Sequence, residues 1–144
     1  MTAIDAMFAI IRAELTRPGS QLPAGYSNWA GYCQMWSRIA VGAPGPPRYG
    51  SAIDNWNAAP AVNKHPNSSV PWTGSLVFWA TGNPNGHVAP CVGPGLVAST
   101  DILVRGQVSV VPITEIAARW GARLLGWAAF CNGAHLMTAP DRHI

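Results

Sequence analysis

The N-terminal segment carries apolar side chains at helical spacing. Within residues 3–16 these positions lie three or four residues apart, so they share one face of a helix. They are Ile4, Met7, Phe8, Ile11 and Leu15. Thr2, followed by Asp5 three residues later, has the spacing of a capping box, and Pro18 with Gly19 ends the run. The pattern therefore predicts an amphipathic helix over residues 3–16.

A second helical pattern follows a loop-like segment. Asn28 is a suitable N-cap, because its side chain can accept a hydrogen bond from a backbone amide of the first turn. Gly42 and the proline-rich stretch after it end the run. The residues expected to face the interior are Trp29, Cys33, Trp36 and Ala40. We therefore expect a helix between Asn28 and Gly42 with an aromatic inner face.

The next segment predicts a short helix and then a loop. Ser51, with Asp54 three residues later, can cap a helix that runs through Trp56 and closes before Pro60. Residues 63–73 are polar and have neither a helical nor an alternating pattern. We expect this stretch to be a loop.

Beyond residue 75 the pattern changes to short runs rich in Val, Leu and aromatic residues, bounded by Gly, Asn and Pro. These runs, at 76–81, 87–92, 96–100 and 107–111, are typical of antiparallel strands. A brief helix capped by Thr114 and ended by Gly121 follows. Residues 127–131 and 134–137 flank Asn132-Gly133, a strong signal for a two-residue hairpin. Helices followed by a meandering sheet predict an α+β domain.

Composition restricts the class of protein. A length of 144 residues with a 49% hydrophobic share predicts a single domain over residues 1–144. The net charge of +3 comes from basic residues spread along the chain, which disfavours nucleic acid as a partner. No apolar run approaches the roughly 20 residues of a bilayer-spanning helix, so we expect a soluble protein without membrane insertion. The N-terminus lacks the basic start and the cleavage site of a signal peptide.

The three cysteines and six acidic residues limit metal chemistry. Cys33, Cys91 and Cys131 do not have the spacing of a zinc site, and the acidic residues do not cluster as in a calcium loop. We therefore expect neither a metal nor a cofactor. Cys91 and Cys131 fall within or beside predicted strands, where they either pack or form a disulfide with each other.

Cys33 and His87 are the residues best placed for thiol chemistry. Cys33 lies near the start of the second predicted helix, where unpaired amides and the helix dipole lower the pKa of a thiol. The alternative is that Cys33 simply packs, because free cysteines are usually buried. His87 stands at the mouth of a predicted strand, on a rigid element that is still accessible, although an ordinary loop-end histidine has the same pattern.

A predicted hairpin brings an acidic residue to His87. A three-residue loop at 93–95 pairs the flanking strands so that His87 faces Asp101. An aspartate in that place fixes the imidazole tautomer and stabilises the imidazolium that forms when histidine takes a thiol proton. A slip of one residue in the register would instead offer Thr100.

Three blocks of sequence, in order along the chain, resemble a known enzyme family. The blocks are NWAGYCQ at 28–34, GSLVFW at 74–79 and GHVA at 86–89. They are similar to the CHAP domain (cysteine, histidine-dependent amidohydrolase/peptidase) and to the related NlpC/P60 group. The likeness extends through short motifs up to residue 127, and the whole pattern of motifs is similar to that of lysins from phages that infect actinobacteria. It covers roughly residues 26–135.

The resemblance implies a papain-like α+β fold, in which N-terminal helices pack on a central antiparallel sheet. Residues 1–25 would form an N-terminal helix and loop, and residues 26–138 the catalytic core. Carried over residue by residue, Cys33 is the nucleophile, His87 the base and Asp101 the orienting group. Many members use Glu followed by Asn as the orienting pair, whereas this chain offers only Asp101.

A second departure concerns the block before the first strand. Ser75 stands where the family usually carries an acidic residue. The oxyanion donors are expected to include the Cys33 amide, with Tyr32 or Gln34 as helpers. Trp36 and Trp79 are further candidates for substrate contact, although most of the seven tryptophans are expected to lie in the core.

The resemblance also implies the substrate and the place of action. The family cleaves peptide bonds in the stem or cross-bridge of bacterial peptidoglycan, or the amide between muramic acid and L-alanine, without a cofactor. A phage endolysin of this kind is made in the host cytoplasm and acts on the cell wall, and we expect it to be a monomer. Two alternatives remain open: a wall-binding module without catalysis, and a papain-like protease that acts on protein.

Overall fold

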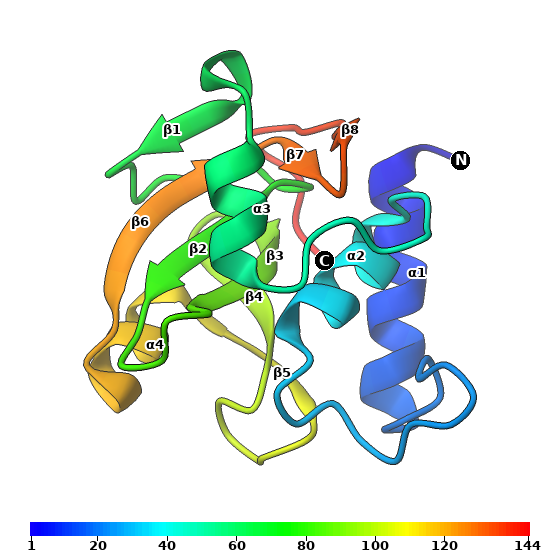
Figure 1. Cartoon of the computed structure of the whole chain (residues 1–144). Coiled ribbons are helices and arrows are strands. Elements are labelled where there is room, and N and C mark those ends of the chain that lie inside the picture. Colours follow the sequence, from blue (N-terminus) through cyan, green and yellow to red (C-terminus); the bar gives the residue numbers. More distant parts are fainter.

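Six antiparallel strands form the central sheet of the computed structural model, which describes residues 1–144 (Figure 1). The strands are β1 (Lys64–Pro66), β2 (Leu76–Ala80), β3 (His87–Gly93), β4 (Leu96–Thr100), β5 (Val108–Pro112) and β6 (Arg123–Ala128), in the order β1-β6-β2-β3-β4-β5. The α-helices are α1 (Ala3–Thr16), α2 (Cys33–Val41), α3 (Ala52–Ala58) and α4 (Ile113–Trp120), and a 3-10 turn spans Ala61–Asn63. A separate hairpin joins β7 (Phe130–Cys131) to β8 (Ala134–His135). The predicted α+β class is confirmed.

The first helix has the predicted bounds, with the predicted capping box between Thr2 and Asp5. One position of its apolar face was wrongly assigned. Leu15 is exposed, and Glu14 is buried in its place. The carboxylate of Glu14 accepts hydrogen bonds from the backbone amides of Gly19 and Gln21, because the loop after the helix folds back over it.

The second helix starts later than its sequence pattern predicted. Its N-cap is Tyr32, and no side chain caps it. Asn28, five residues before the helix, instead accepts a hydrogen bond from the Ala30 amide. Gly31 has a φ of 77°, a left-handed conformation through which a helix cannot run. The helix therefore begins at Cys33. Its end at Gly42, in the left-handed conformation, is as predicted.

The third helix confirms the predicted cap. Ser51 is the N-cap of α3, and its hydroxyl accepts a hydrogen bond of 3.1 Å from the Asp54 amide. This cap fixes the start of a helix that borders the pocket described below.

Replacing Ser51 with alanine is expected to lower the free energy of unfolding by about 1 kcal/mol, because an orphan amide of the first turn loses its acceptor. Urea denaturation measures the change. Ser51→Asp is the matched control, since aspartate is an equally good N-cap. Equal destabilisation by both substitutions would contradict a capping role.

The four strands predicted between residues 76 and 111 are present, with shifts of one residue at some ends. The region predicted as a loop at 63–73 contains β1, which pairs with β6, and most of β6 was missed as well. Each of these two strands depends on its partner. Gly126 of β6, with a φ of 136°, packs so close to the His65 carbonyl that an added Cβ would lie 2.2 Å from that oxygen. The predicted cap of α4 was also wrong, since Pro112 is its N-cap and not Thr114.

Alternation along β2 builds a core on both faces of the sheet. Leu76 and Phe78 pack on the side of α3, while Val77 and Trp79 pack with residues of α4 on the other side. A third cluster joins α1 and α2, which lie side by side at one edge of the molecule (Figure 1). None of the helices combines the length and the apolar composition that crossing a membrane requires.

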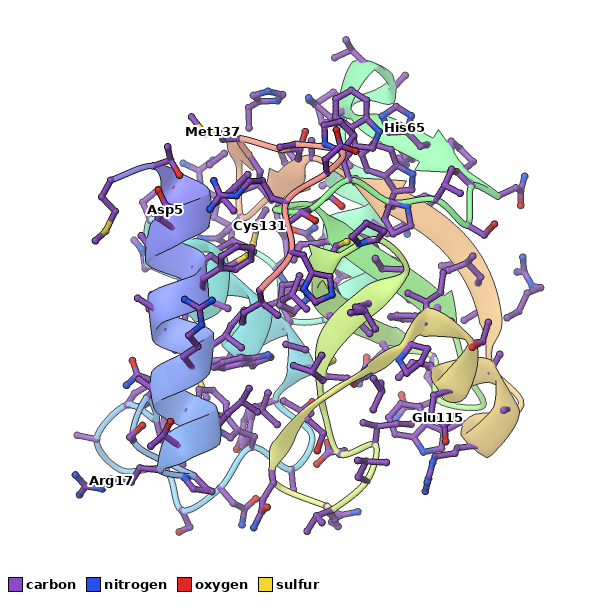
Figure 2. The ribbon with its side chains drawn as sticks, turned by 180° about the vertical axis from the view of Figure 1, so that it is seen from behind. Asp5, Arg17, His65, Glu115, Cys131 and Met137 are labelled. Carbon is purple, nitrogen blue, oxygen red and sulfur yellow. The ribbon has the colours of Figure 1, made fainter.

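The C-terminal segment ties α1 to the sheet. Figure 2 shows it running from Met137 beside α1, whose amino-terminal end carries Asp5. Arg142 forms an ion pair with Asp5, and the Ile144 amide donates to the Val92 carbonyl of β3. The helix that precedes the proposed nucleophile is therefore held against the strand that begins with His87.

Candidate active site

Cys33, His87 and Asp101, which are far apart in the sequence, line one pocket of about 350 Å³. The pocket lies between the amino-terminal end of α2, the start of β3 and the loop that precedes α3. Its lining residues are Tyr26, Gly31, Tyr32, Cys33, Gln34, Met35, Arg38, Pro47, Tyr49, Gly50, Ser51, Ala52, Asn83, Asn85, Gly86, His87, Asn132 and Asp101. The structure therefore brings the three predicted catalytic residues to the same cavity.

Cys33 is the first residue of α2, so its thiol lies at the helix tip. Burial raises the pKa of the thiol, and the backbone amides of Val88, Gln34 and Cys33 itself act in the opposite direction by hydrogen bonding. The other two cysteines are free and buried, and burial raises the pKa of Cys91 to about 11 and that of Cys131 to about 12. Cys91 and Cys131 are thus packed and not bonded. Cys33 is the one thiol that faces the pocket.

His87 is the first residue of β3 and is only 5% exposed. Its imidazole packs against two indoles, with ring centroids 5.7 Å from Trp79 and 4.8 Å from Trp120. This burial lowers the pKa of His87 to about 4. Near neutral pH the imidazole is therefore unprotonated and able to accept a proton.

Ser99 is the hydrogen-bond partner of His87. The distance from His87 Nε2 to Ser99 Oγ is 2.8 Å, and Ser99 Oγ donates its own hydrogen to the Thr100 carbonyl at 3.0 Å. A hydroxyl has a single hydrogen, so Ser99 must accept from Nε2–H. Nδ1 of the neutral ring consequently carries the lone pair, which assigns the tautomer required of a base acting through Nδ1.

Replacing Ser99 with alanine is expected to remove this control. The buried Nε2–H loses its acceptor, so the Nδ1–H tautomer becomes populated and turnover falls by about tenfold. Imidazole ¹⁵N shifts report the tautomer directly: one Nε2–H form is expected in the unmodified protein and a mixture in Ser99→Ala. Ser99→Thr, which keeps the hydroxyl, should restore the single form. An unchanged ¹⁵N pattern in Ser99→Ala would refute the assignment.

Asp101 does not occupy the predicted place beside His87. Its carboxylate accepts hydrogen bonds from the amides of Gly31 and Gly106, at 3.0 Å and 2.6 Å. The paired positions of β3 and β4 are confined to the end near their turn, with a bulge between Cys91 and Gly93. Asp101 follows β4 and has a φ of 66°, which turns its side chain away from the ladder. Its visible role is to hold the Gly31 loop that leads into α2.

The thiol and the imidazole pack on different sides of the sheet. The His87 ring contacts Trp79 and Trp120 on the α4 side, whereas Cys33 packs against the cluster that contains Phe78 and Val88. The backbone of Val88, the residue that follows His87, lies near enough to the Cys33 sulfur to lower the pKa of the thiol. No hydrogen bond joins the sulfur to the imidazole itself. Catalytic hydrogen bonds are often long in ligand-free proteins and shorten when substrate is bound. Direct proton transfer therefore requires the His87 side chain to turn from the α4 side of the sheet toward the pocket.

The four residues predicted to contact substrate divide into two groups. Tyr32, which is 43% exposed, and Gln34 both line the pocket. Trp36 and Trp79 are 0% and 1% exposed and do not line it. Trp36 donates a hydrogen bond from Nε1 to the Ala98 carbonyl, and Trp79 packs against His87 from the core. For these two tryptophans the prediction of substrate contact is wrong, because helix and strand both point them inward.

Two residues of the site were missed by sequence reasoning. Ser99 was missed because the ideal hairpin register placed Asp101, and not Ser99, opposite His87. Arg38 lies one turn along α2 from Gln34 and also lines the pocket. Its spacing of four residues from Gln34 on a helix was the available signal.

Comparison of the chain with protein-family models, with curated proteins and with solved structures gave no match. The likeness to the CHAP domain therefore rests on the sequence blocks, and the chemistry rests on the pocket around Cys33 and His87.

Proposed function

We propose that this protein is a cysteine-dependent peptidoglycan hydrolase with a papain-like CHAP fold. The observation that carries the proposal is the single pocket lined by both Cys33 and His87. A thiol at a helix tip and an unprotonated imidazole from a neighbouring strand are the two groups that thiol hydrolysis needs. The order of elements, with helices first and an antiparallel sheet after them, agrees with that family.

The proposed reaction proceeds through an acyl-enzyme. With its ring turned toward the pocket, His87 Nδ1 takes the thiol proton as the Cys33 sulfur attacks the scissile carbonyl, and the same proton then passes to the leaving amine. Water, deprotonated by His87, attacks the resulting thioester and releases the carboxylic acid. Each step uses residues of this chain and water.

The oxyanion that forms during attack needs hydrogen-bond donors near Cys33. The first turn of α2 supplies them, because the earliest backbone hydrogen bond into this helix is from the Trp36 amide to the Tyr32 carbonyl. The amides of Cys33 and Gln34 therefore have no partner within the helix. Both amides lie beside the sulfur. This arrangement supports an oxyanion site built from backbone groups and strengthened by the helix dipole.

The resemblance to phage lysins supports cell-wall peptidoglycan as the substrate. Acting as an endolysin, the protein would be made in the host cytoplasm and reach the wall on lysis. The pocket rim suits a peptide linked to a sugar, since Tyr26 and Tyr32 meet edge to face at 5.1 Å and are both exposed.

Digestion of purified peptidoglycan tests the proposal, with casein as a parallel protein substrate. Mass spectrometry of the soluble fragments is expected to show new peptides from the wall and little cleavage of casein. The fragment masses identify the bond as a peptide bond or as the muramoyl amide. Cleavage of casein alone would assign a protease instead, and binding to the wall without any release would assign a module that only binds.

A further inference from the structure

Gln34 and Arg38 share the α2 side of the pocket, and each carries a buried polar atom without a partner. Both lie on α2, four residues apart and therefore on one helix face. Gln34 is 9% exposed, and neither Oε1 nor Nε2 of its amide makes a hydrogen bond. Nε of Arg38 is also buried and unpartnered. Burying a polar group without a hydrogen bond costs free energy. The presence of several such groups at one pocket therefore indicates that they form their hydrogen bonds with a ligand.

The charge of Arg38 is not neutralised within the protein. The two salt bridges of the structure join Arg119 to Glu115 and Arg142 to Asp5. Asp101 is the acidic residue of the pocket lining, and its carboxylate is occupied by two backbone amides. His87 contributes no charge near neutral pH, because its pKa lies at about 4. The pocket therefore presents a guanidinium that lacks a counter-ion.

We propose that Gln34 and Arg38 form a carboxylate-binding subsite, and that the preferred acyl donor carries a free carboxylate on the α2 side of the scissile carbonyl. The guanidinium matches a carboxylate through two parallel hydrogen bonds, and the Gln34 amide supplies a further donor. One cation with one neutral donor suits a single negative charge. The statement about the acyl donor rests on the proposed function, whereas the carboxylate subsite does not.

The helix sets the spacing between the nucleophile and the subsite. Arg38 follows Cys33 by five residues, so their Cα atoms differ by about 7 Å along the axis. A carboxylate held by Arg38 is therefore separated from the carbon that the sulfur attacks by a spacer of several bonds. Reagents with graded spacers can locate the subsite without any knowledge of the natural substrate.

Alkylation of Cys33 by N-iodoacetyl ω-amino acids of increasing chain length tests the subsite. In each reaction the sulfur forms a bond to the methylene carbon, iodide leaves and the thiol proton passes to solvent. Every free acid is compared with its carboxamide, and mass spectrometry of the Cys33 peptide gives the rate. At the best spacer length the acid is expected to react about tenfold faster than its amide, as one charged hydrogen-bonded contact would produce.

Variants of the two arginines in this region provide the contrast. Arg38→Met should abolish the acid preference, measured as the ratio of acid to amide rates within the variant, so that any general change in thiol reactivity cancels. The thermal unfolding midpoint verifies that the variant is folded. Arg38→Lys keeps the charge without the fork and should retain part of the preference. Arg48→Met is the matched control, because this substitution removes the same charge from an exposed position. Arg48 lies on the loop beside the pocket but does not line it. It should leave the preference unchanged.

The subsite is refuted if acids and amides react alike at every spacer length, or if the preference survives Arg38→Met. An equal loss in Arg48→Met would also refute it, since the preference would then come from overall charge. Failure of the proposed function has a different signature: wall hydrolysis that does not depend on Cys33, together with an intact acid preference in alkylation. A lost preference with normal, Cys33-dependent hydrolysis would remove the subsite and leave the function standing.

Discussion

Replacing Cys33 with alanine is expected to reduce the hydrolysis of purified peptidoglycan by at least about a thousandfold, because Cys33 is the one thiol that lines the pocket. The rate of fragment release, followed by mass spectrometry or by clearing of a wall suspension, measures the effect. Cys33 is partly buried at the first residue of α2, so loss of its sulfur should change stability little. The thermal unfolding midpoint should stay close to that of the unmodified protein.

Cys91→Ala is the matched control for this experiment. Cys91 is a buried thiol on β3 that does not line the pocket. Its removal is expected to cost some stability and to leave the rate of hydrolysis largely unchanged at temperatures where the variant is folded. Clearing of walls by Cys33→Ala at the unmodified rate would end the proposal of thiol catalysis, and Cys33 would then be a packing residue.

Acid is expected to destabilise the fold through His87. Burial lowers the pKa of the imidazole from 6.5 to about 4, so the unfolded chain binds a proton in this range that the folded protein does not. Stability is therefore highest above pH 6.5 and falls as the pH drops toward 4. The loss from this one group amounts to about 3 kcal/mol. Below pH 4 the contribution of His87 becomes constant, since both states are protonated.

His87→Gln isolates this effect, because glutamine can still donate a hydrogen bond to Ser99 but does not titrate. Urea unfolding of both proteins at several pH values should give curves that converge toward acid, with the unmodified protein losing about 3 kcal/mol more than the variant between pH 6.5 and 4. Asp5 does not interfere. Its ion pair with Arg142 keeps its pKa well below 3.8, so its own contribution is lost at lower pH. Parallel curves would show that the imidazole is not buried as described.

Local patterns predicted the helices and strands whose signals lie within their own residues. The apolar spacing of α1 and the Ser51 cap of α3 are of this kind. The prediction of where α2 starts was wrong because the left-handed conformation of Gly31 prevents the helix from beginning before it. A potential cap residue alone does not reveal such a turn. Strand β1 has the polar sequence Lys64–Pro66 and exists through its pairing with β6. Three residues are too few to show the alternation of apolar and polar side chains that predicts a strand.

The candidate site was predictable to the extent that its chemistry follows residue type. Cys33 and His87 line one pocket, as thiol chemistry requires, although their direct contact stays a prediction. Asp101 was misplaced because an ideal ladder was extended beyond a bulge, where the two strands separate. The roles of Ser99 and Arg38 depend on the relative placement of distant elements. The contact of Ser99 with the imidazole and the lack of a salt-bridge partner for Arg38 can be read only from the three-dimensional structure.

Asn132 fixes the backbone of the loop that forms one wall of the pocket. This turn residue, with a φ of 52°, donates through Nδ2 to the carbonyls of Pro44 and Pro46 and accepts at Oδ1 from the Arg48 amide. Its own amide donates to Asn55 of α3. All three contacts with the loop are made to main-chain atoms, so they do not depend on which side chains residues 44–50 carry. The shape of this wall of the cavity thus depends on main-chain contacts to a single asparagine.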